Sequence, residues 1–567
     1  MDIKQPPAPA SLPPRELDVI TPFHEPQDVP IDDSNSGISG QGGSMSQVRR
    51  RSRFRITMIL IALYLSLFIA ALDSTIVSTA VPKITADLHS AAGYIWVGGS
   101  YLIANAAAAP IWVKLSDIWG RKPILLAAVV VFFASSIVCA AAVDMQMLIV
   151  GRSIQGAAAG GLICMVNVAI SDLFSVRERS LWLGLCEGIW ALSGAVGPLL
   201  GGAFAQEVTW RWCFYCNLPI AGTAFVLLVP FLDVHNPRTS VMDGVKAIDW
   251  FGSISILGVT VMLLLGLDLG GSVYPWGSAK VVCLMVFGAL MVIIFIYSEK
   301  KLAKYPVIPL SLFGTRNLAT LMTTFFHGMV FISAEYYLPL YFQSVKEASP
   351  LRSGVLLVPL IVATAGTGVI NGVIIHRTGQ YRPSMWLGTI LMTLGTGLYI
   401  MLDVDTSIGT IVGLEIVEGI GSGLLFEPPL IAIQQDVAQD EVGTATSTQS
   451  FMRSLALSLG VIVGGIVFQQ SMDLRRSSLI EAGLPPSLVE QFSGKNAGAN
   501  VMLGHTLPPA QKLAVKQAFA WSIRNMFIMF TALGALGIFA SLFISHKKLS
   551  KEHEETVTGL KKDDPSP

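Results

Sequence analysis

Charge is scarce in this sequence. Lysine and arginine number 38, aspartate and glutamate also number 38, and together they make up 13% of the 567 residues. That share is about half of what soluble domains carry. The net charge of zero gives no electrostatic reason for a polyanionic partner such as nucleic acid. Because 52% of the residues are apolar and the mean hydropathy is +0.61, the sequence predicts a protein whose solvent is lipid.

Cysteines are few and offer no metal or redox site. Each lies inside or at the edge of an apolar segment, where a thiol packs as a small apolar group. The six are Cys139, Cys164, Cys186, Cys213, Cys216 and Cys283. Cys213 and Cys216 form a C-x-x-C, but neither a second pair nor a histidine cluster accompanies them. We therefore expect no metal and no cofactor.

The sequence also lacks the short motifs of ATP-driven pumps and hydrolases. No G-x-x-x-x-G-K-[ST] occurs, which excludes a P-loop ATPase. No G-x-S-x-G elbow occurs, and no nucleophile–base pair stands on a soluble domain. We expect a protein that is not an enzyme.

Long apolar runs are present instead. A helix needs about 20 apolar residues to cross a bilayer, and the alternating pattern of a membrane barrel is absent. Fourteen candidate spans occur: 58–80, 93–113, 124–143, 145–173, 181–204, 212–232, 248–270, 280–297, 318–342, 354–375, 384–402, 408–433, 444–469 and 519–544. The sequence therefore predicts an all-α polytopic membrane protein with 14 transmembrane helices.

Basic residues predict the orientation of these spans. Residues 1–57 are rich in Pro, Asp, Ser and Gly and are predicted to form a disordered tail. Arginines cluster just before the first span, and the loops on the same side hold most other lysines and arginines. By the positive-inside rule, both termini are predicted to be cytosolic, including a tail at 547–567. Segment 470–518 is predicted to be a long extracytosolic loop.

The loop after the second span predicts a clasp between helices. It reads Lys114 to Pro123 and holds Asp117, Gly120 and Arg121 around a glycine turn. An acid before the turn and a base after it can pair in one conformation and separate in another. The simpler interpretation is a basic loop with a turn.

This loop, L-S-D-x-x-G-R-K, resembles the signature loop of the major facilitator superfamily. Other motifs resemble its fourteen-spanner drug:proton antiporter branch, known from fungal multidrug and toxin efflux pumps. They are Leu72–Val77 with Pro82, the set Leu148, Arg152, Gln155 and Gly156, the run Gly194–Gly202, the string Trp210–Pro219, and Tyr336–Gln343.

The resemblance implies the major facilitator fold, with two six-helix bundles around a central cavity. The first bundle would be 58–232 and the second 318–546. Residues 233–317 would hold two additional helices between the bundles. Efflux pumps of this branch exchange small lipophilic compounds for protons by alternating access. We accordingly expect protons, a small-molecule substrate and the bilayer as partners, and a monomer.

Ionisable residues inside spans are costly and tend to be functional. Asp73 and Arg152 both fall in the outer half of the bilayer, so we expect them either to pair or to compete for one proton. Our hypothesis is that Asp73 carries the coupling proton and that Arg152 tunes its affinity. The alternative is a permanent structural ion pair.

Small residues in the fifth span predict a pivot. The candidates for conformational gating there are Gly194, Gly197, Pro198, Gly201 and Gly202, beside Asp117, Gly120 and Arg121 of the loop. Small residues let helices approach closely, and a proline bends the helix. Ordinary close packing is the alternative.

The remaining candidates concern the substrate. Adaptable apolar pockets suit lipophilic ligands, and the expected cavity residues are Trp96, Tyr101, Trp190, Phe326, Tyr336 and Tyr337, with Glu335 near the outer mouth. Glu415 and Glu418 share a helix face, and one of them is predicted to pair with Arg453.

Proton-coupled efflux of drugs, toxins or secondary metabolites is the favoured function. Vacuolar transport of a basic amino acid, or transport of an iron chelate, remains an alternative, as does a transporter-like nutrient receptor. The location is correspondingly the plasma membrane or the vacuolar membrane.

Overall fold

The computed structural model describes residues 52–89, 93–235, 237, 239–270, 274–552, 556, 558 and 559. Of the predicted tail at 1–57, residues 1–51 lie outside the described residues. Residues 53–57 belong to the first helix, so that end of the predicted tail was wrong. Within the described residues all regular secondary structure is helical, apart from one isolated bridge between Gly270 and Tyr274. This confirms the predicted all-α class.

The first half of the chain folds into six spans. Its helices are α1 (Arg53–Asp87), α2 (Gly93–Trp119), α3 (Arg121–Ala140), α4 (Met145–Leu173), α5 (Val176–Ala203), and α6 (Trp212–Tyr215) continued by α7 (Asn217–Phe231). Polar residues begin several of them. Asp144 accepts a hydrogen bond from the backbone N–H of Met147 at 2.7 Å and so caps α4. At Gly120 the backbone has a φ of 96°, which glycine adopts without strain, and there α2 ends and α3 begins.

The second half repeats this arrangement. Its helices are α11 (Thr315–Ser344), α12 (Pro350–Thr378), α13 (Arg382–Leu398), α14 (Ile408–Gly423) followed by α15 (Pro428–Gln435), α16 (Val442–Leu474) and α20 (Pro509–Ser541). The span of α14 and α15 is broken because Pro428 and Pro429 cannot donate the backbone hydrogen bonds that would continue the helix.

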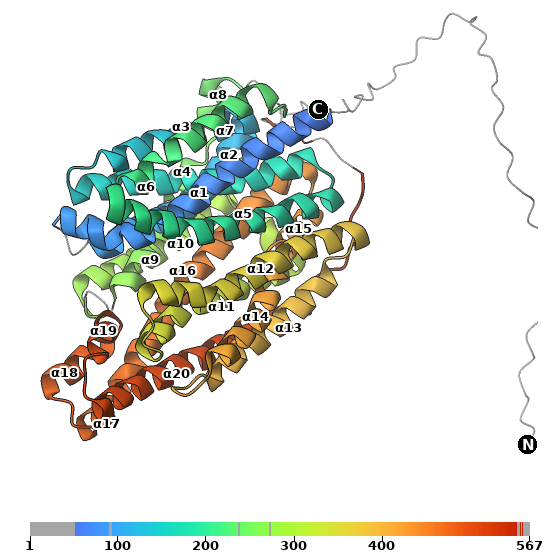
Figure 1. The fold of residues 1–567 in the computed structure, drawn as a ribbon. Coiled ribbons are helices and arrows are strands. Elements are labelled where there is room, and N and C mark those ends of the chain that lie inside the picture. The colour runs from blue at the N-terminus through green and yellow to red at the C-terminus, as the bar shows by residue number, and fades with distance from the viewer. Residues whose placement is uncertain are drawn as a thin grey trace, which may run out of the picture. The chain divides into compact units, whose positions relative to one another are not determined.

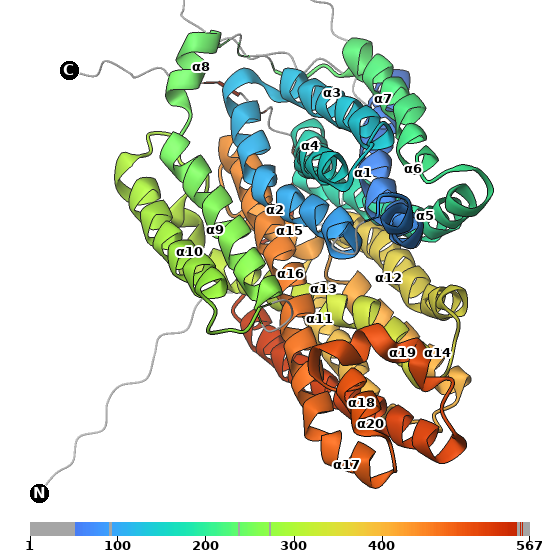
Figure 2. The same cartoon turned by 90° about the vertical axis from the view of Figure 1, so that its left-hand side faces the viewer.

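Three further α-helices of the described chain lie between the two halves in sequence. They are α8 (Val241–Ala247), α9 (Trp250–Leu269) and α10 (Ala279–Tyr297). The hairpin of α9 and α10 lies beside α2 of the first bundle and α16 of the second (Figure 2).

Segment 470–518 is largely helical rather than an open loop. Helix α16 continues to Leu474 and α20 begins at Pro509, and between them lie α17 (Arg476–Glu481), α18 (Pro486–Gln491) and α19 (Val501–Gly504). Figure 1 shows these short helices gathered at one end of α20. Their apolar residues Leu479, Val489 and Phe492 are buried in one cluster with α20, so the segment forms a packed cap.

Thirteen helical stretches within the described residues are long and apolar enough to cross a membrane. They coincide with thirteen of the predicted spans. The remaining one, 93–113, lies in the 27-residue α2. A helix of that length extends about 40 Å, and α2 packs along α4 through glycines. A Cβ on Gly156 would lie 2.2 Å from the carbonyl oxygen of Tyr101.

The largest contacts between the bundles are those of α5 with α12 and of α2 with α16, and α16 with α4 and α15 with α5 add smaller ones. We call the end of the bundles where Asp117 lies the Asp117 end. The opposite end, which carries the cap, is the Asp473 end. Glycines let α5 and α12 approach closely: a Cβ on Gly372 would lie 2.4 Å from the carbonyl oxygen of Ser180, and 3.2 Å from the Cα of Gly184.

Candidate functional site: a gate and buried charges

The predicted clasp is formed at the Asp117 end. The guanidinium of Arg121 forms an ion pair with Asp117, and its Nε donates to Oδ2 of Asp172 on α4 at 2.8 Å. Arg121 is only 1% exposed, so the pairing takes place away from bulk water. The turn at Gly120 brings the acid and the base together. The acid of α4 was not among the sequence candidates.

This clasp also contacts the second bundle. The hydroxyl of Thr444, on α16, donates to Oδ2 of Asp117 at 3.2 Å. A Cβ on Gly443 would lie 2.7 Å from Nη2 of Arg121, so α16 begins directly against the arginine. The charges of the clasp therefore link residues within the first bundle and also contact the second bundle.

A second bridge joins the bundles beside the clasp. Arg179 of α5 is 1% exposed and donates to Gln434 at 3.3 Å and to Gln439 at 3.1 Å. Gln434 in turn donates to the hydroxyl of Ser171 at 2.9 Å. Arg179 was not among the site candidates from the sequence. Its burial and its partners depend on the contact between the bundles, and the sequence of a single helix does not indicate that contact.

The described part of the C-terminal segment crosses the same end. The hydroxyl of Thr556 donates to Oδ1 of Asp172 and accepts from Gln439, both at 2.8 Å. The backbone N–H of Gly559 donates to the carbonyl of Asp117 at 2.9 Å. Lys547 forms an ion pair with Asp436 at 2.7 Å. This segment therefore touches both bundles where they meet.

Asp73 and Arg152 lie together inside the first bundle and form an ion pair. Both are buried, at 0% and 1% exposure. The other oxygen of Asp73 accepts from Gln155 at 2.9 Å and from Asn217 at 2.8 Å. The guanidinium of Arg152 also lies over the ring of Tyr101, 4.2 Å from its centroid. Asn217 was missed as a partner, although it belongs to the Trp210–Pro219 motif.

The small residues of α5 divide into two faces. A Cβ on Gly197 would lie 2.1 Å from Oγ1 of Thr75, and one on Gly201 would lie 1.9 Å from the carbonyl of Ile76. These two glycines therefore form the contact with α1. Gly194 and Gly202 have nothing within 4 Å of such a Cβ and face away from it. Pro198 lies inside the helix, and its carbonyl accepts from Thr79 at 3.2 Å.

Three of the expected cavity residues lie in contacts between helices. Tyr101 is buried in the first bundle and donates to the carbonyl of Ala70 at 2.9 Å. Tyr337 is buried in the second bundle and donates to the carbonyl of Val461 at 2.5 Å. The Cβ of Phe326 lies 3.2 Å from where a Cβ on Gly537 would be. In this structure these three rings fill contacts between helices, which differs from the predicted cavity wall.

The other expected cavity residues are more accessible. Tyr336 is 57% exposed, whereas Trp96, Trp190 and Glu335 are partly buried. Glu335 interacts electrostatically with Glu418 inside the second bundle. These four residues come from α2, α5 and α11, and none of them lines the pocket described below.

The predicted pairing of Glu415 or Glu418 with Arg453 was wrong. Glu418 accepts from Ser422 at 2.5 Å, four residues along the same helix. Arg453 instead donates to the carbonyl of Phe426 at 2.6 Å and interacts with Glu187 and Glu427. The face that Glu415 and Glu418 share on α14 points elsewhere in the second bundle.

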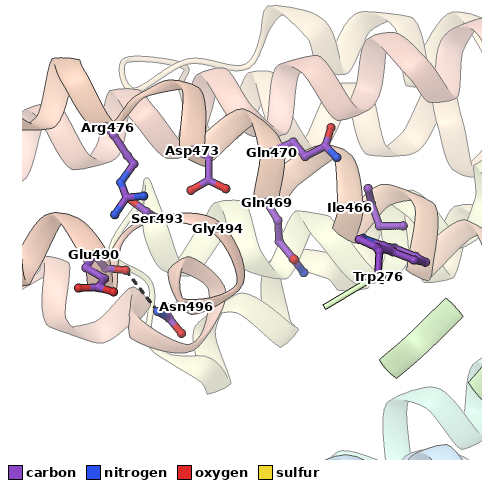
Figure 3. A pocket seen from close by; sticks show the side chains of 10 residues that line it. All are labelled: Trp276, Ile466, Gln469, Gln470, Asp473, Arg476, Glu490, Ser493, Gly494 and Asn496. Atoms are coloured by element: carbon purple, nitrogen blue, oxygen red, sulfur yellow. Dashed lines mark hydrogen bonds between the residues drawn. The ribbon is translucent and has the colours of Figure 1, made fainter. Parts of the chain in front are cut away.

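A pocket of about 350 Å³ lies at the Asp473 end (Figure 3). Its wall is mostly polar. The lining residues are Trp276, Ile466, Gln469, Gln470, Asp473, Arg476, Glu490, Ser493, Gly494 and Asn496. It lies between the end of α16 and the cap, away from the buried charges, and no sequence signal pointed to it.

The family model of the Major Facilitator Superfamily matches residues 63–461. The chain belongs to the Major Facilitator Superfamily. It is 44% identical over 506 residues to a protein named efflux pump dotC from Dothistroma septosporum, covering 89% of this chain and 87% of that one. It is 35% identical over 515 residues to efflux pump FUS6 from Gibberella moniliformis, covering 90% of this chain and 91% of the relative.

Solved structures of the superfamily share the fold. The proton:xylose symporter XylE matches with a TM-score of 0.58 and 14% identity, over 88% of this chain and 98% of that one. The human organic anion transporter MFSD10 matches with a TM-score of 0.57 and 14% identity, over 86% of this chain and 99% of that one. Membership of the superfamily makes this chain a membrane transporter of small molecules.

Proposed function

We propose that this protein is a proton-coupled efflux pump for small lipophilic compounds and works by alternating access. The observation that carries the proposal is the closed contact between bundles at the Asp117 end, formed by the clasp and by Arg179. A carrier of this kind must open and close such an end in each cycle. The efflux pumps named above, similar over most of the chain, favour export over the alternatives of uptake or sensing.

The Asp117 end is proposed to face the cytosol. It holds Arg121, Lys122, Arg177 and Arg179, and basic loops stay on the cytosolic side. With this end closed, the structure corresponds to a carrier whose cargo site is shut off from the cytosol. We place the protein in the plasma membrane, with the vacuolar membrane as the alternative.

Asp73 and Arg152 remain the coupling pair proposed from the sequence. In their favour, a carboxylate and a guanidinium lie buried together, and a proton on Asp73 would free Arg152 from its ion pair. Gly197 and Gly201 are the proposed pivot, because α1, which carries Asp73, packs on them.

The test uses cells that lack their own multidrug pumps and express the full chain. Retention of a panel of fluorescent lipophilic dyes and of lipophilic fungal extracts is compared with and without a protonophore. We expect lower retention in expressing cells, and loss of that difference once the proton gradient is collapsed. Export that continues at the full rate without any ion gradient would overturn the proposal.

A further inference from the structure

A second group of buried charges lies where the two bundles meet. Glu187 comes from α5 of the first bundle, and Arg453 comes from α16 of the second. Glu427 lies in the break between α14 and α15. Arg453 interacts electrostatically with both glutamates. We call these three residues the interbundle triad.

The break in the span explains why an arginine is present. Residues 424–427 separate α14 from α15, and a broken helix leaves backbone carbonyls without helical partners. Arg453 donates from Nη2 to one of them, the carbonyl of Phe426, at 2.6 Å. Its guanidinium also lies 4.8 Å from the centroid of the Phe426 ring. Arg453 is therefore fixed to the second bundle by contacts that do not involve either glutamate.

One carboxyl group of the triad, that of Glu427, is poorly satisfied by comparison with Asp73. Glu427 is 2% exposed, and neither of its side-chain oxygens has a hydrogen-bond partner within the described residues. Asp73, in contrast, accepts from Arg152, Gln155 and Asn217. A buried carboxylate without partners is costly, so the Glu427 side chain is poised to bind a proton or to approach the arginine.

Counting charge gives the number of protons. Two ionised glutamates and one arginine carry a net charge of −1, and burying that charge is unfavourable. One bound proton makes the triad neutral, whichever glutamate receives it. The remaining ionised glutamate then pairs with Arg453. The arrangement thus favours one proton shared between two carboxyl groups on different bundles.

The two carboxyl groups differ in how they would move. Glu187 lies against α12, where its Cγ is 3.1 Å from the position of a Cβ on Gly368. Glu427 and Arg453 both belong to the second bundle. When the bundles move relative to each other, the separation of Arg453 from Glu187 changes, whereas Glu427 moves together with the arginine. The partner of Arg453 can therefore depend on the conformation.

We propose that Glu187, Glu427 and Arg453 form a proton-binding site between the bundles, in which one proton is exchanged between the two glutamates and solvent as Arg453 changes partner. The proposal rests on proton-coupled transport and adds a site to the Asp73 pair. In one state Glu187 is paired and Glu427 holds the proton. In the other state, Glu427 is paired with Arg453. The proton bound to the triad then passes to water on the side where the two bundles are open.

Two other titratable groups face the triad. His327 of α11 is 1% exposed and interacts electrostatically with Arg453, and Cys186 of α5 interacts with both glutamates. His327 lies between aromatic rings, with centroids 4.9 Å from Phe426 and 5.9 Å from Phe331. These rings shield the triad from water. Away from water, the interaction between the arginine and a glutamate is stronger, so the charges of the triad depend more on one another.

The experiment follows the infrared absorption of protonated carboxyl groups in the purified full-length protein, reconstituted in lipid, as the buffer pH is varied. The probe is the proton itself, so no cargo is needed. The variants are Glu187→Gln, Glu427→Gln and the double variant, with Glu427→Asp as the control that keeps a carboxyl group. Either single glutamine leaves one glutamate for Arg453, so both proteins are expected to fold.

We expect each single variant to lose the titrating signal of one carboxyl group. The double variant should lose no more than either single one, because the two glutamates share one proton. Glu427→Asp should keep the signal. Unchanged signals in both single variants would overturn the proposal, and so would a loss in the double variant equal to the sum of two independent losses. If the signals behave as expected but wild-type efflux ignores a protonophore, the proposed function fails and the proton site stands.

Discussion

The hydroxyl of Thr556 donates a hydrogen bond to Oδ1 of Asp172, a residue 384 positions earlier in the chain, at a distance of 2.8 Å. The other oxygen of this carboxylate accepts from Nε of Arg121, so the C-terminal segment and the clasp share one acid. Because Gln439 of the second bundle also donates to Thr556, this single side chain joins both bundles at the Asp117 end.

This relationship predicts that Thr556 stabilises the closed Asp117 end. Replacement Thr556→Val keeps the shape of the side chain but leaves one oxygen of Asp172 and the amide of Gln439 without this partner. The expected cost is on the order of 1 kcal/mol. Hydrogen–deuterium exchange should become faster at residues 442–449, the start of α16, which meets the clasp.

The matched control for that change is Thr556→Ser, which keeps the hydroxyl. It should exchange like the wild type at the same residues. Equal exchange in the valine and serine variants would show that the hydroxyl does not hold the gate.

Two faces of α5 give a paired prediction. Gly197→Ala places a methyl group against Thr75, where a Cβ would lie 2.1 Å from Oγ1, and should separate α5 from α1. Overpacking of this kind costs about 1–3 kcal/mol. We expect reduced efflux with retained membrane expression, measured in the same dye-retention assay.

Gly194→Ala is the control, since nothing lies within 4 Å of its Cβ position. It should transport like the wild type. Similar losses of efflux in the two alanine variants would point to a change in helix propensity or in expression. A Gly197→Ala protein with normal efflux would rule out the proposed pivot.

The Asp73 pair allows the structural and proton-carrying roles to be separated. Asp73→Asn leaves Arg152 buried without its ion-pair partner, and breaking a buried pair in this way costs about 3–5 kcal/mol. The double variant Asp73→Asn/Arg152→Gln removes both charges and should recover much of the thermal stability lost in the single variant.

Substrate-driven proton flux in vesicles then decides the role of Asp73. If Asp73 carries the proton, the stabilised double variant remains uncoupled. A double variant that is stable and still couples substrate to proton movement would assign the pair to structure alone.

Sequence reasoning located the spans because length and apolarity alone determine them. The pairing of Asp73 with Arg152 was also within reach, since ionisable groups in lipid need partners. The partners of Arg179 and the role of Asn217 could not be predicted in this way, because they arise from contacts between helices that are distant in sequence. The cap at 476–504 was missed because its polar composition resembles that of an ordinary loop.

The loop between α11 and α12 gives a prediction about pH. Glu347 forms ion pairs with Lys516 at 2.6 Å and Lys512 at 3.5 Å, which tie this loop to the start of α20. The hydrogen bond from Lys516 lowers the pKa of the Glu347 carboxyl below its usual value. A lowered pKa in the folded state means that the stabilisation is present above the unfolded pKa of about 4.3. It is lost as the pH falls through the lower folded value.

Glu347→Gln should therefore lower the thermal stability of the detergent-solubilised protein at neutral pH, but not in strong acid, where the wild-type carboxyl is already protonated. Because the side chain of Glu347 is 32% exposed and water screens the pair, the expected loss is at most about 1 kcal/mol. Glu481→Gln is a suitable control, since Glu481 lies on the cap at the same end of the bundles but takes part in none of these ion pairs. A loss for Glu347→Gln that is as large in acid as at neutral pH would mean that shape, rather than charge, holds the loop to α20.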